Sequence, residues 1–414
     1  MTDTSITEEP LNELSTFASW ITESKGYATG FANADFNQDQ LIDIVISYGN
    51  DMNKGPIEIY LNEDGILPQE PSWTSYHTAF YAHISTGDLN GDGYPDIVAS
   101  RYIGSSDFLE PGGIDIYINQ NGHFFATPDQ QYDGLYTFGN ALGDIDNDGD
   151  LDLAIATGEI YTQQQQSVEI WKNQNGYFEP FWKQNTSGYA YDVCFGDVNS
   201  DGYADLFIVQ NKSPHCWYLS TGTTINYDPE ICSEPPSSQL GNRCTVGHFN
   251  ANEKLDWMVS NTAQNNLEQG FVDLWLDGDL VWQSETSDMY SGITVWKSEE
   301  QSHFFISSWW GDIVGFEWKE DHMQEFWRTY NDDIVAEELL AFSPQATVHR
   351  ISGNGLYTLP LNSLVLSVQG GVFTSNQIYA TGTWTATIAI SEKPALFVSN
   401  WDPNVGSLGY FPLE

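Results

Sequence analysis

A nine-residue acidic loop that recurs along the chain limits the possible folds more than any other feature of the sequence. Its clearest copy is Asp88–Asp96 (DLNGDGYPD), which carries oxygen-bearing side chains at loop positions one, three, five and nine. Similar loops begin at residues 35, 144 and 197, so successive copies start 53, 56 and 53 residues apart. This near-constant spacing predicts a fold built from repeated structural units.

Each of these loops has the composition of a cation site. Ca²⁺ takes roughly six to eight oxygen ligands in flexible geometry, and Gly91 and Gly93 allow a tight turn around the ion. We therefore expect about four structural Ca²⁺ sites, with a ligand at position seven in addition to positions one, three, five and nine. The alternative is that the loops are solvated acidic turns. The predicted ligands are Asp35, Asn37, Asp39, Leu41, Asp43, Asp88, Asn90, Asp92, Tyr94, Asp96, Asp144, Asp146, Asp148, Asp150, Asp152, Asp197, Asn199, Asp201, Tyr203 and Asp205.

A fifth copy of the loop, residues 248–256, departs from this composition. It has His248 and Asn252 at positions one and five, where the other copies have aspartate, and Lys254 at position seven. Because it has lost two carboxylates and gained a cation, we interpret it as a metal-free relic of the same loop.

The segments around each loop repeat as well. In the first unit a strand of small residues (28–32) precedes the loop, and an apolar strand (42–47) and an alternating strand (57–62) follow it. An Asp-Gly hairpin signal at residues 64–65 then leads to a more polar fourth strand at 71–76. Four strands per unit of about 50 residues, without helical periodicity, predict the blades of a β-propeller.

We expect residues 1–414 to form a single propeller, with loop-bearing blades within 28–260 and degenerate blades within 290–414. Counting inner strands favours eight blades. Seven is the alternative, because the unit at 339–383 is the most degraded. The start of the chain resembles a fourth strand and its end resembles a third, so pairing these two strands is predicted to close the ring and remove an exposed sheet edge.

The loops and strands resemble those of the FG-GAP (VCBS-type) repeat family, which includes the propeller head of integrin α subunits. The loops at 88–96, 144–152 and 197–205 match its motif fully, whereas the loop at 35–43 has Gln40 in place of glycine. The resemblance covers residues 28–260 well and the remainder only by strand pattern. It implies a propeller with Ca²⁺ loops between the first and second strands of several blades, but not one function, because the fold serves adhesins, lectins and enzymes.

The charge of the chain excludes some classes of partner. The chain has 13 Lys and Arg residues and 58 Asp and Glu residues, which gives a formal net charge of −45. Nucleic acids and anionic membranes would be repelled by such a surface. No apolar run reaches the length of about 18 residues that a membrane helix needs. The polar N-terminus lacks a signal pattern, and we expect a secreted or cell-surface protein whose signal is absent from this sequence, because weak Ca²⁺ sites fill outside cells.

All four cysteines of the chain lie within residues 194–244, and none has the CxxC spacing of a zinc site. Cys216 and Cys232 flank a predicted hairpin. They can form a disulfide in an oxidising compartment or remain buried thiols, and the sequence leaves both alternatives open.

Candidate ligand-binding residues gather on the face opposite the acidic loops. Tyrosines recur where a fourth strand leads into the next first strand, and a ring of them suits sugar stacking or a partner's anchor residues; packing between blades is the alternative. The longer loops on this face are 100–113, 158–166 and 260–270, with a shorter one near Trp310. The predicted ligand residues are Tyr27, Tyr81, Tyr136, Tyr189, Tyr290, Arg101 and Trp310.

No standard catalytic motif occurs in the chain. The sequence therefore favours a binding or adhesion module for carbohydrate or protein. The alternatives are a polysaccharide lyase or glycosidase on the same scaffold and a structural subunit of a surface assembly, and the oligomeric state is left open. A pocket that joined Arg101, His83 and Arg243 to Tyr81 would favour the enzyme.

Overall fold

The protein is an all-β structure in the part of the chain that the structure describes. The computed structural model describes residues 20–328, 395–399 and 408–412, apart from gaps at 25, 27, 40, 42, 50, 52, 64–65, 234–239, 251, 253, 264–269, 286–287, 289, 298–301, 309–312 and 320–321. All regular elements in these ranges are strands.

Twenty-four consecutive strands form six antiparallel sheets of four strands each, and within each sheet the spatial order follows the chain. The first three sheets are β2 (Ala28–Ala34), β3 (Asp43–Gly49), β4 (Lys54–Tyr60) and β5 (Trp73–Thr74); β6 (Phe80–Gly87), β7 (Asp96–Ile103), β8 (Pro111–Tyr117) and β9 (Gln130–Leu135); and β10 (Asn140–Gly143), β11 (Asp152–Ile155), β12 (Glu169–Asn173) and β13 (Phe178–Lys183). The next three are β14 (Ala190–Gly196), β15 (Asp205–Gln210), β16 (Cys216–Tyr218) and β17 (Ile231–Cys232); β18 (Leu240–Gly247), β19 (Asp256–Thr262), β20 (Val272–Leu276) and β21 (Asp279–Gln283); and β22 (Tyr290–Lys297), β23 (Ser302–Ser308), β24 (Ile313–Lys319) and β25 (His322–Arg328).

A seventh sheet joins the two ends of the chain. It has the order β1 (Trp20–Ile21), β27 (Leu408–Pro412), β26 (Ala395–Ser399), and Trp20 lies opposite Tyr410. The predicted pairing of an N-terminal with a C-terminal strand is thus present. The degraded unit at 339–383 lies outside the described residues, so the number of blades and the closure of the ring stay predictions.

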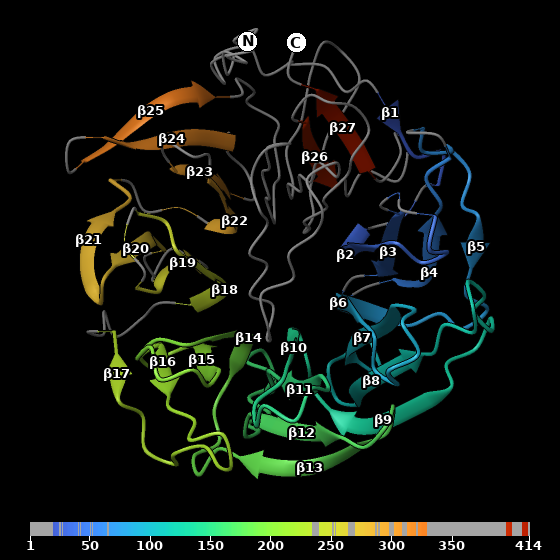
Figure 1. Ribbon diagram of the computed structural model, residues 1–414, viewed down its shortest axis with the longest axis horizontal. Coiled ribbons are helices and arrows are strands. Elements are labelled where there is room, and N and C mark those ends of the chain that lie inside the picture. The colour runs from blue at the N-terminus through green and yellow to red at the C-terminus, as the bar shows by residue number, and fades with distance from the viewer. Residues whose placement is uncertain are drawn as a thin grey trace, which may run out of the picture.

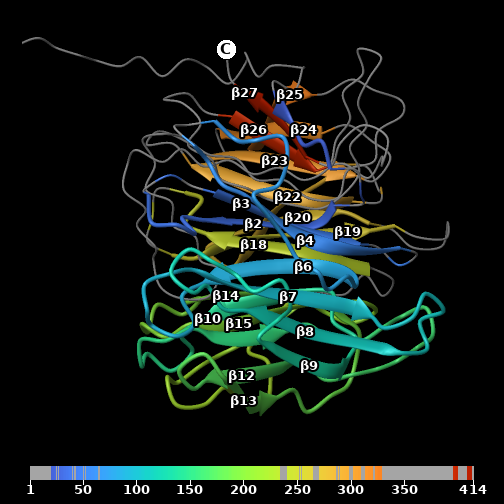
Figure 2. The same cartoon turned by 90° about the vertical axis from the view of Figure 1, so that its right-hand side faces the viewer.

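The sheets stand around a common centre like the blades of a propeller. Figure 1 shows the first strand of each four-stranded sheet nearest the centre and the fourth at the rim, and Figure 2 shows the same sheets from the side. All seven residues of β3 are buried, whereas exposed and partly buried residues alternate along much of β9. The second strand is the buried part of its blade, which agrees with the continuous apolar run of its sequence.

The hydrophobic core lies between neighbouring sheets. One cluster joins Ala32, Val45 and Ile57 of the first blade to Ile84 and Ile97 of the second. Similar clusters follow around the ring. Each blade therefore buries its apolar faces only by packing against the next, as expected for a repeat fold.

Hydrogen bonds at the end of the third strand join adjacent blades beside the acidic loops. The side-chain amide of Asn119 donates to the carbonyl of Phe36 in the preceding blade at 2.8 Å, and that of Asn173 donates to the carbonyl of Leu89 at 2.7 Å. Both asparagines are buried. Buried polar groups need such partners, and these bonds fix the position of each loop relative to the next blade.

Two disulfides use all four cysteines. Cys216 and Cys232 are directly opposite each other on β16 and β17, so the disulfide is the alternative present in the structure. Cys194 and Cys244 are bonded as well, and they link the first strands of two adjacent blades. The sequence did not indicate this second pairing, because it depends on which strands become neighbours.

Candidate functional site

The acidic loops join the first and second strands of their blades, and their turns are held by the carboxylate at position one. In the loop 88–96, Asp88 accepts the backbone N–H groups of Asp92 at 3.1 Å and of Gly93 at 2.7 Å. Asp144 and Asp197 accept the corresponding N–H groups in their own loops. Gly93 has φ +90°, which favours glycine at this position.

Positions three and five add further oxygens on the same turn. In the loops beginning at 35, 88 and 197, the position-three asparagine accepts the N–H of position five at 2.9–3.0 Å through Oδ1. The position-five carboxylate accepts the N–H of position seven in all four loops. The amide oxygen and the carboxylates therefore lie on one short loop. Such a set of oxygens fits a hard cation.

The position-nine aspartates are buried and hold two parts of a blade together. Asp96 accepts the N–H of Leu89 at 2.9 Å and the N–H of Asn119, just after the third strand, at 2.7 Å. The same pair of bonds is made at Asp43, Asp152 and Asp205. Burial raises the pKa of each of these four carboxyl groups to about 7, against the lowering effect of the backbone donors. This role in the fold was not predicted from the sequence.

The loop 144–152 is the most acidic of the four. Asp144, Asp146 and Asp148 each present one carboxylate oxygen, and these oxygens lie within 4.8 Å of one another. Within the described part of the chain, Asp146 Oδ1 and Asp150 Oδ1 are buried and have no hydrogen-bond partner. Buried carboxylate oxygens without donors are unfavourable unless a cation or water satisfies them, so this donor set fits Ca²⁺.

The fifth loop keeps the position-nine hydrogen bonds without carboxylates at positions one and five. Asp256 at position nine accepts the N–H groups of Phe249 at 2.7 Å and Asp277 at 2.9 Å. His248 at position one contacts the carbonyl of Lys254 through Nδ1. These bonds thus form without carboxylates at positions one and five.

The predicted tyrosine ring is largely taken up by packing. Tyr81 and Tyr136 are 1% and 4% exposed, whereas Tyr189 and Tyr290 are partly buried. Tyr27 lies outside the described residues, as does Trp310. Burial of Tyr81 and Tyr136 favours the alternative of packing between blades at these two positions, because a stacking surface must be open to its ligand.

Arg101 and Tyr81 meet at the buried carboxylate of Asp115. Arg101 Nε donates to Asp115 Oδ1 at 2.7 Å, and the Tyr81 hydroxyl donates to Oδ2 at 2.8 Å. His77 Nδ1 lies 2.9 Å from the same oxygen. These partners hold the pKa of Asp115 below its usual range although burial acts in the opposite direction. Arg243 instead lies over the ring of Phe138 in another part of the fold.

Two loops on the face opposite the acidic loops contact each other. They follow the second strands of adjacent blades. The Tyr136 hydroxyl donates to the carbonyl of Phe108, and Thr162 Oγ1 lies 3.0 Å from the same carbonyl oxygen. The rings of Phe108 and Tyr161 are 5.3 Å apart. Leu109 and Tyr161 remain 64% and 51% exposed. Tyr161 lies within the loop 158–166 that the sequence predicted, but its contact with Phe108 could not be predicted from the sequence.

The buried carboxylate of Glu159 anchors the second of these loops. It accepts the N–H and the hydroxyl of Thr162 at 2.7 and 2.6 Å. Glu159 is fully buried. Nothing in the sequence distinguished this residue among 58 acidic residues. These hydrogen bonds therefore hold in place the loop that carries the exposed ring of Tyr161.

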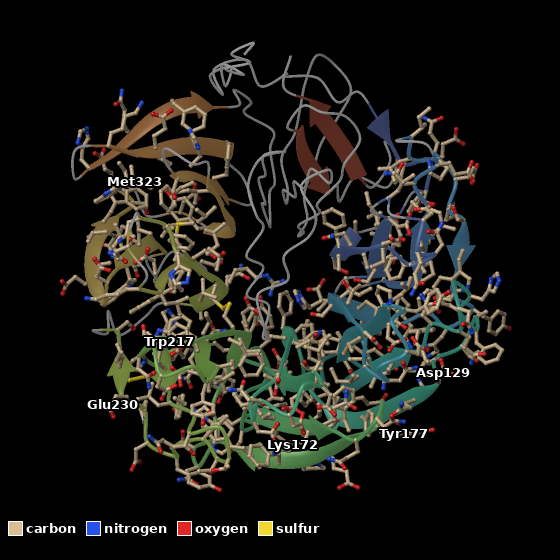
Figure 3. All side chains as sticks on the ribbon, viewed as in Figure 1. Asp129, Lys172, Tyr177, Trp217, Glu230 and Met323 are labelled. Carbon is tan, nitrogen blue, oxygen red and sulfur yellow. A yellow bond between two sulfur atoms is a disulfide. The ribbon has the colours of Figure 1, made fainter. Side chains whose placement is uncertain are left out.

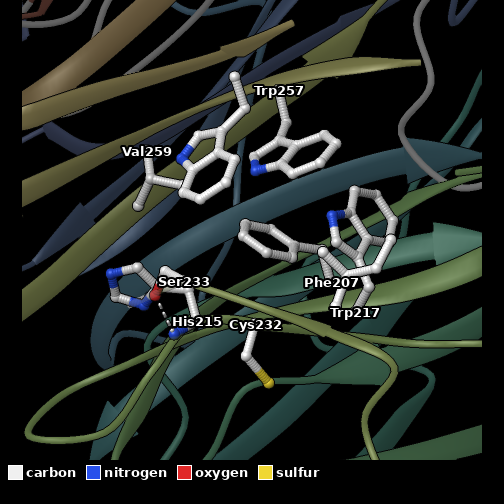
Figure 4. A pocket seen from close by; sticks show the side chains of 9 residues that line it. Phe207, His215, Trp217, Cys232, Ser233, Trp257 and Val259 are labelled. Carbon is white, nitrogen blue, oxygen red and sulfur yellow. Dashed lines mark hydrogen bonds between the residues drawn. The ribbon is translucent and has the colours of Figure 1, made fainter. Parts of the chain in front are cut away.

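An aromatic pocket lies between the sheets β14–β17 and β18–β21. Its lining includes Phe207, Trp217 and Trp257 together with His215, Ser233 and Cys232, as Figure 4 shows. Burial lowers the pKa of His215 to about 4, so the imidazole is neutral. The pocket is narrow and its aromatic rings pack on one another, which is typical of a core gap between blades.

Comparison with known proteins agrees with the geometry of these loops. Residues 35–99, which span the first two acidic loops, match the family model of the FG-GAP-like repeat. The chain carries an FG-GAP repeat. The strands and loops of the first five blades follow one pattern, and we refer to its nine-residue loops as the FG-GAP loops.

Two curated relatives share part of the chain. Phosphatidylinositol-glycan-specific phospholipase D of Mus musculus is 29% identical over 180 residues, which cover 36% of this chain and 21% of that protein. Integrin alpha-4 of Xenopus laevis is 27% identical over 240 residues, covering 53% of this chain and 22% of that protein. The matched region thus represents about a fifth of the length of either relative.

A solved structure shares the fold across most of this chain. A chain of the crystal structure of BBS1N in complex with ARL6DN, soaked with lead, superposes with a TM-score of 0.52 at 9% identity. The match covers 91% of this chain and 96% of that chain. At this identity the likeness concerns the fold alone. In the described residues, no helix has the length and apolar character needed to cross a membrane.

Proposed function

We propose that this protein is a calcium-stabilised, integrin-like FG-GAP propeller that acts as a binding module for a protein ligand, with carbohydrate as the other ligand class. The observation that carries the proposal is the repetition of one turn in four loops. Each turn places oxygens of positions one, three and five beside a buried position-nine carboxylate. Integrin alpha-4 is among the relatives.

The Ca²⁺ ions of this proposal are structural. Positions one, three, five and nine of each loop would hold the ion, with position seven as a further ligand. When bound, the ion supplies positive charge that offsets the repulsion among the loop carboxylates. Neighbouring loops already contact each other, since Gln38 donates to the carbonyl of Gly93 and Asn147 to that of Gly202. Filling the loops would therefore stiffen one whole face of the propeller.

The proposed ligand surface is the opposite face, where Leu109 and Tyr161 are exposed on two loops that brace each other. An apolar and aromatic patch on a rigid base is typical of a protein-binding hot spot. The antiparallel order of each sheet places these loops at the end of the blade away from the FG-GAP loops. Calcium and ligand would thus occupy different faces.

The proposed location is extracellular or on a cell surface. Both disulfides support it, because all four cysteines are paired and disulfides persist in oxidising compartments. The relationship to integrin alpha-4 points the same way.

No described contact specifically favours the enzyme alternative. Tyr81 and Arg101 do meet, but they meet at Asp115, and the Tyr81 hydroxyl is buried there. Arg243 lies against Phe138 rather than beside them. The activity in the name of the phospholipase D relative belongs to a protein of which the match covers 21%.

A binding screen tests the proposal. The full chain, labelled, is applied to arrays of extracellular proteins and of glycans, in Ca²⁺ and in excess chelator. We expect a protein ligand that binds in Ca²⁺, and at least a tenfold loss of affinity (about 1.4 kcal/mol) when Leu109 and Tyr161 are both changed to alanine.

The matched control is Tyr177→Ala, because Tyr177 is equally exposed but lies on a third-to-fourth-strand hairpin, on the side of the FG-GAP loops. Binding to the glycan array alone would show that the ligand is a carbohydrate and not a protein. Binding that is unchanged by the double variant would move the site elsewhere, and no binding on either array would contradict the proposal.

A further inference from the structure

The FG-GAP loop 144–152 differs from the other copies at position three. This position is Asp146, whereas the other four loops have asparagine there. An asparagine at position three can donate an N–H to the position-five carboxylate, as Asn90 does to Asp92 at 3.1 Å. The side chain of Asp146 has no N–H to donate and adds a further negative charge instead. The loop therefore needs another source of positive charge.

Lys172 supplies that charge. Its ammonium group pairs with Asp146 Oδ2, although the two residues are 26 positions apart. Lys172 lies on β12 of the same blade, within the sheet β10–β13 (Figure 3). The centroid of the Phe181 ring lies 4.3 Å from the ammonium nitrogen of Lys172. The side chain is 23% exposed, so it is held against the loop rather than extended into solvent.

The lysine is particular to this blade. The following residue, Asn173, donates its backbone N–H to the position-nine carboxylate, and this bond identifies the equivalent position in the other blades. The equivalents of Lys172 are Leu61, Ile118, Leu219 and Leu276. Asp at loop position three and Lys at this strand position thus occur together in one of five blades, and neither occurs in the other four.

The ammonium group and a bound cation would act on the same carboxylate. Asp146 Oδ2 faces Lys172, while Asp146 Oδ1 and Asp150 Oδ1 are buried without a partner in the described structure. A divalent ion bound to these oxygens would lie close to the ammonium group. Like charges at a few ångström in a partly buried site repel strongly. The ion must therefore either displace Lys172 or bind beside it at a cost.

We propose that Lys172 is an internal counter-cation, which occupies Asp146 when the loop is metal-free and weakens the affinity of loop 144–152 for Ca²⁺. This inference rests on the proposed calcium binding by the FG-GAP loops. Of the four loops, 144–152 would then be the one whose Ca²⁺ affinity is set by a side chain outside the loop. Without Lys172, the extra carboxylate would make this loop the tightest site.

Three variants separate the role of Lys172 from general effects of charge. Lys172→Leu introduces the residue type found in most other blades and should fold. Lys172→Arg retains the positive charge at the loop. Lys183→Leu is the matched control, because it removes a lysine of the same blade that pairs with Glu169 at 2.6 Å on the exposed side of the sheet. Both leucine variants change the net charge equally.

Calcium titration by calorimetry on the full chain gives the affinities, and thermal melts in chelator give the metal-free stability. In Lys172→Leu we expect one ion to bind at least about tenfold more tightly than in the wild type. We also expect a lower metal-free melting temperature than in Lys183→Leu, because the loop carboxylates lose their counter-charge. Lys172→Arg should resemble the wild type in both measurements.

Equal affinities in Lys172→Leu and Lys183→Leu, with calcium bound by the wild type, would overturn the role of Lys172 and leave the proposed calcium binding intact. An increased affinity without any loss of metal-free stability would overturn the counter-cation role in the metal-free loop. Absence of calcium binding in the wild type and all variants would overturn both the proposed function and this inference.

Discussion

His215 illustrates, at the scale of a residue, how burial decides the protonation state of a side chain. Its Nδ1 accepts the backbone N–H of Gln210 at 3.1 Å, and its Nε2 lies 2.8 Å from Asn261 Oδ1. A neutral ring that carries its proton on Nε2 satisfies both partners. Since burial disfavours the charged form, the pKa falls to about 4, well below its ordinary value of 6.5.

This shift predicts a pH dependence of stability. Below pH 6.5 the unfolded chain binds a proton at His215 that the folded chain does not bind until about pH 4. The contribution of His215 is therefore complete above pH 6.5 and is lost as the pH falls toward 4, with a slope of up to about 1.4 kcal/mol per pH unit. His215→Gln should remove this slope from the free energy of unfolding, measured by urea titration from pH 4 to 7.

The control for this measurement is His123→Gln, because His123 is exposed on a hairpin. It should keep the pH dependence of the wild type. Identical slopes in His215→Gln and the wild type would show that the buried ring does not contribute as described.

At the scale of an element, the FG-GAP loops are joined to their blades by the position-nine aspartate. Asp256 shows this without any acidic residue at positions one and five, since it still accepts three backbone N–H groups and is fully buried. The carboxylate connects the turn after β18 to the end of β20. The position-nine bonds are thus independent of the acidic residues at positions one and five.

We expect Asp256→Ala to lower the free energy of unfolding by about 2–5 kcal/mol, because three buried or partly buried backbone N–H groups lose their acceptor. The loss should be the same in Ca²⁺ and in chelator. Chemical denaturation measures it, and Asp279→Ala is the control. Asp279 is exposed on β21, and its change should stay within about 0.5 kcal/mol. A similarly small effect at Asp256 would contradict this role of the position-nine carboxylate.

At the scale of the whole molecule, a formal net charge of −45 opposes the compact state through self-repulsion. Apolar packing between blades, the bonds of Asn119 and Asn173 across blade boundaries, and two disulfides act against it. Four Ca²⁺ ions would add eight positive charges on one face. The proposed ions should therefore affect the stability of the entire propeller.

Calcium removal should lower the melting temperature sharply. Each filled site adds about 2.7 kcal/mol when free Ca²⁺ is a hundred times its dissociation constant. We expect about four bound ions by elemental analysis, and a melting temperature that falls in excess chelator and recovers on adding Ca²⁺. Sodium chloride at matched ionic strength should not restore the melting temperature. An unchanged melting temperature together with no bound metal would leave the acidic loops as solvated turns.

The sequence by itself determined the repeating unit of this protein. The spacing of the loops, the alternation in segments such as 57–62 and the hairpin signals before the fourth strands predict strands and hairpins that the structure contains. These features depend on backbone hydrogen bonding and side-chain alternation between nearby residues, which leave a regular pattern in the chain. The loop oxygens were predictable for the same reason, since nine consecutive residues supply them.

Only the tertiary structure decided which side chains from distant segments became partners. It paired Lys172 with Asp146, bonded Cys194 to Cys244 across two blades, and enclosed Tyr81 beside Asp115. Periodicity gives the face of a strand that a residue occupies, but not the element packed against that face or the water it excludes. Burial, charge pairing and the shifted pKa of His215 all follow from that packing, and so became visible only in the assembled blades.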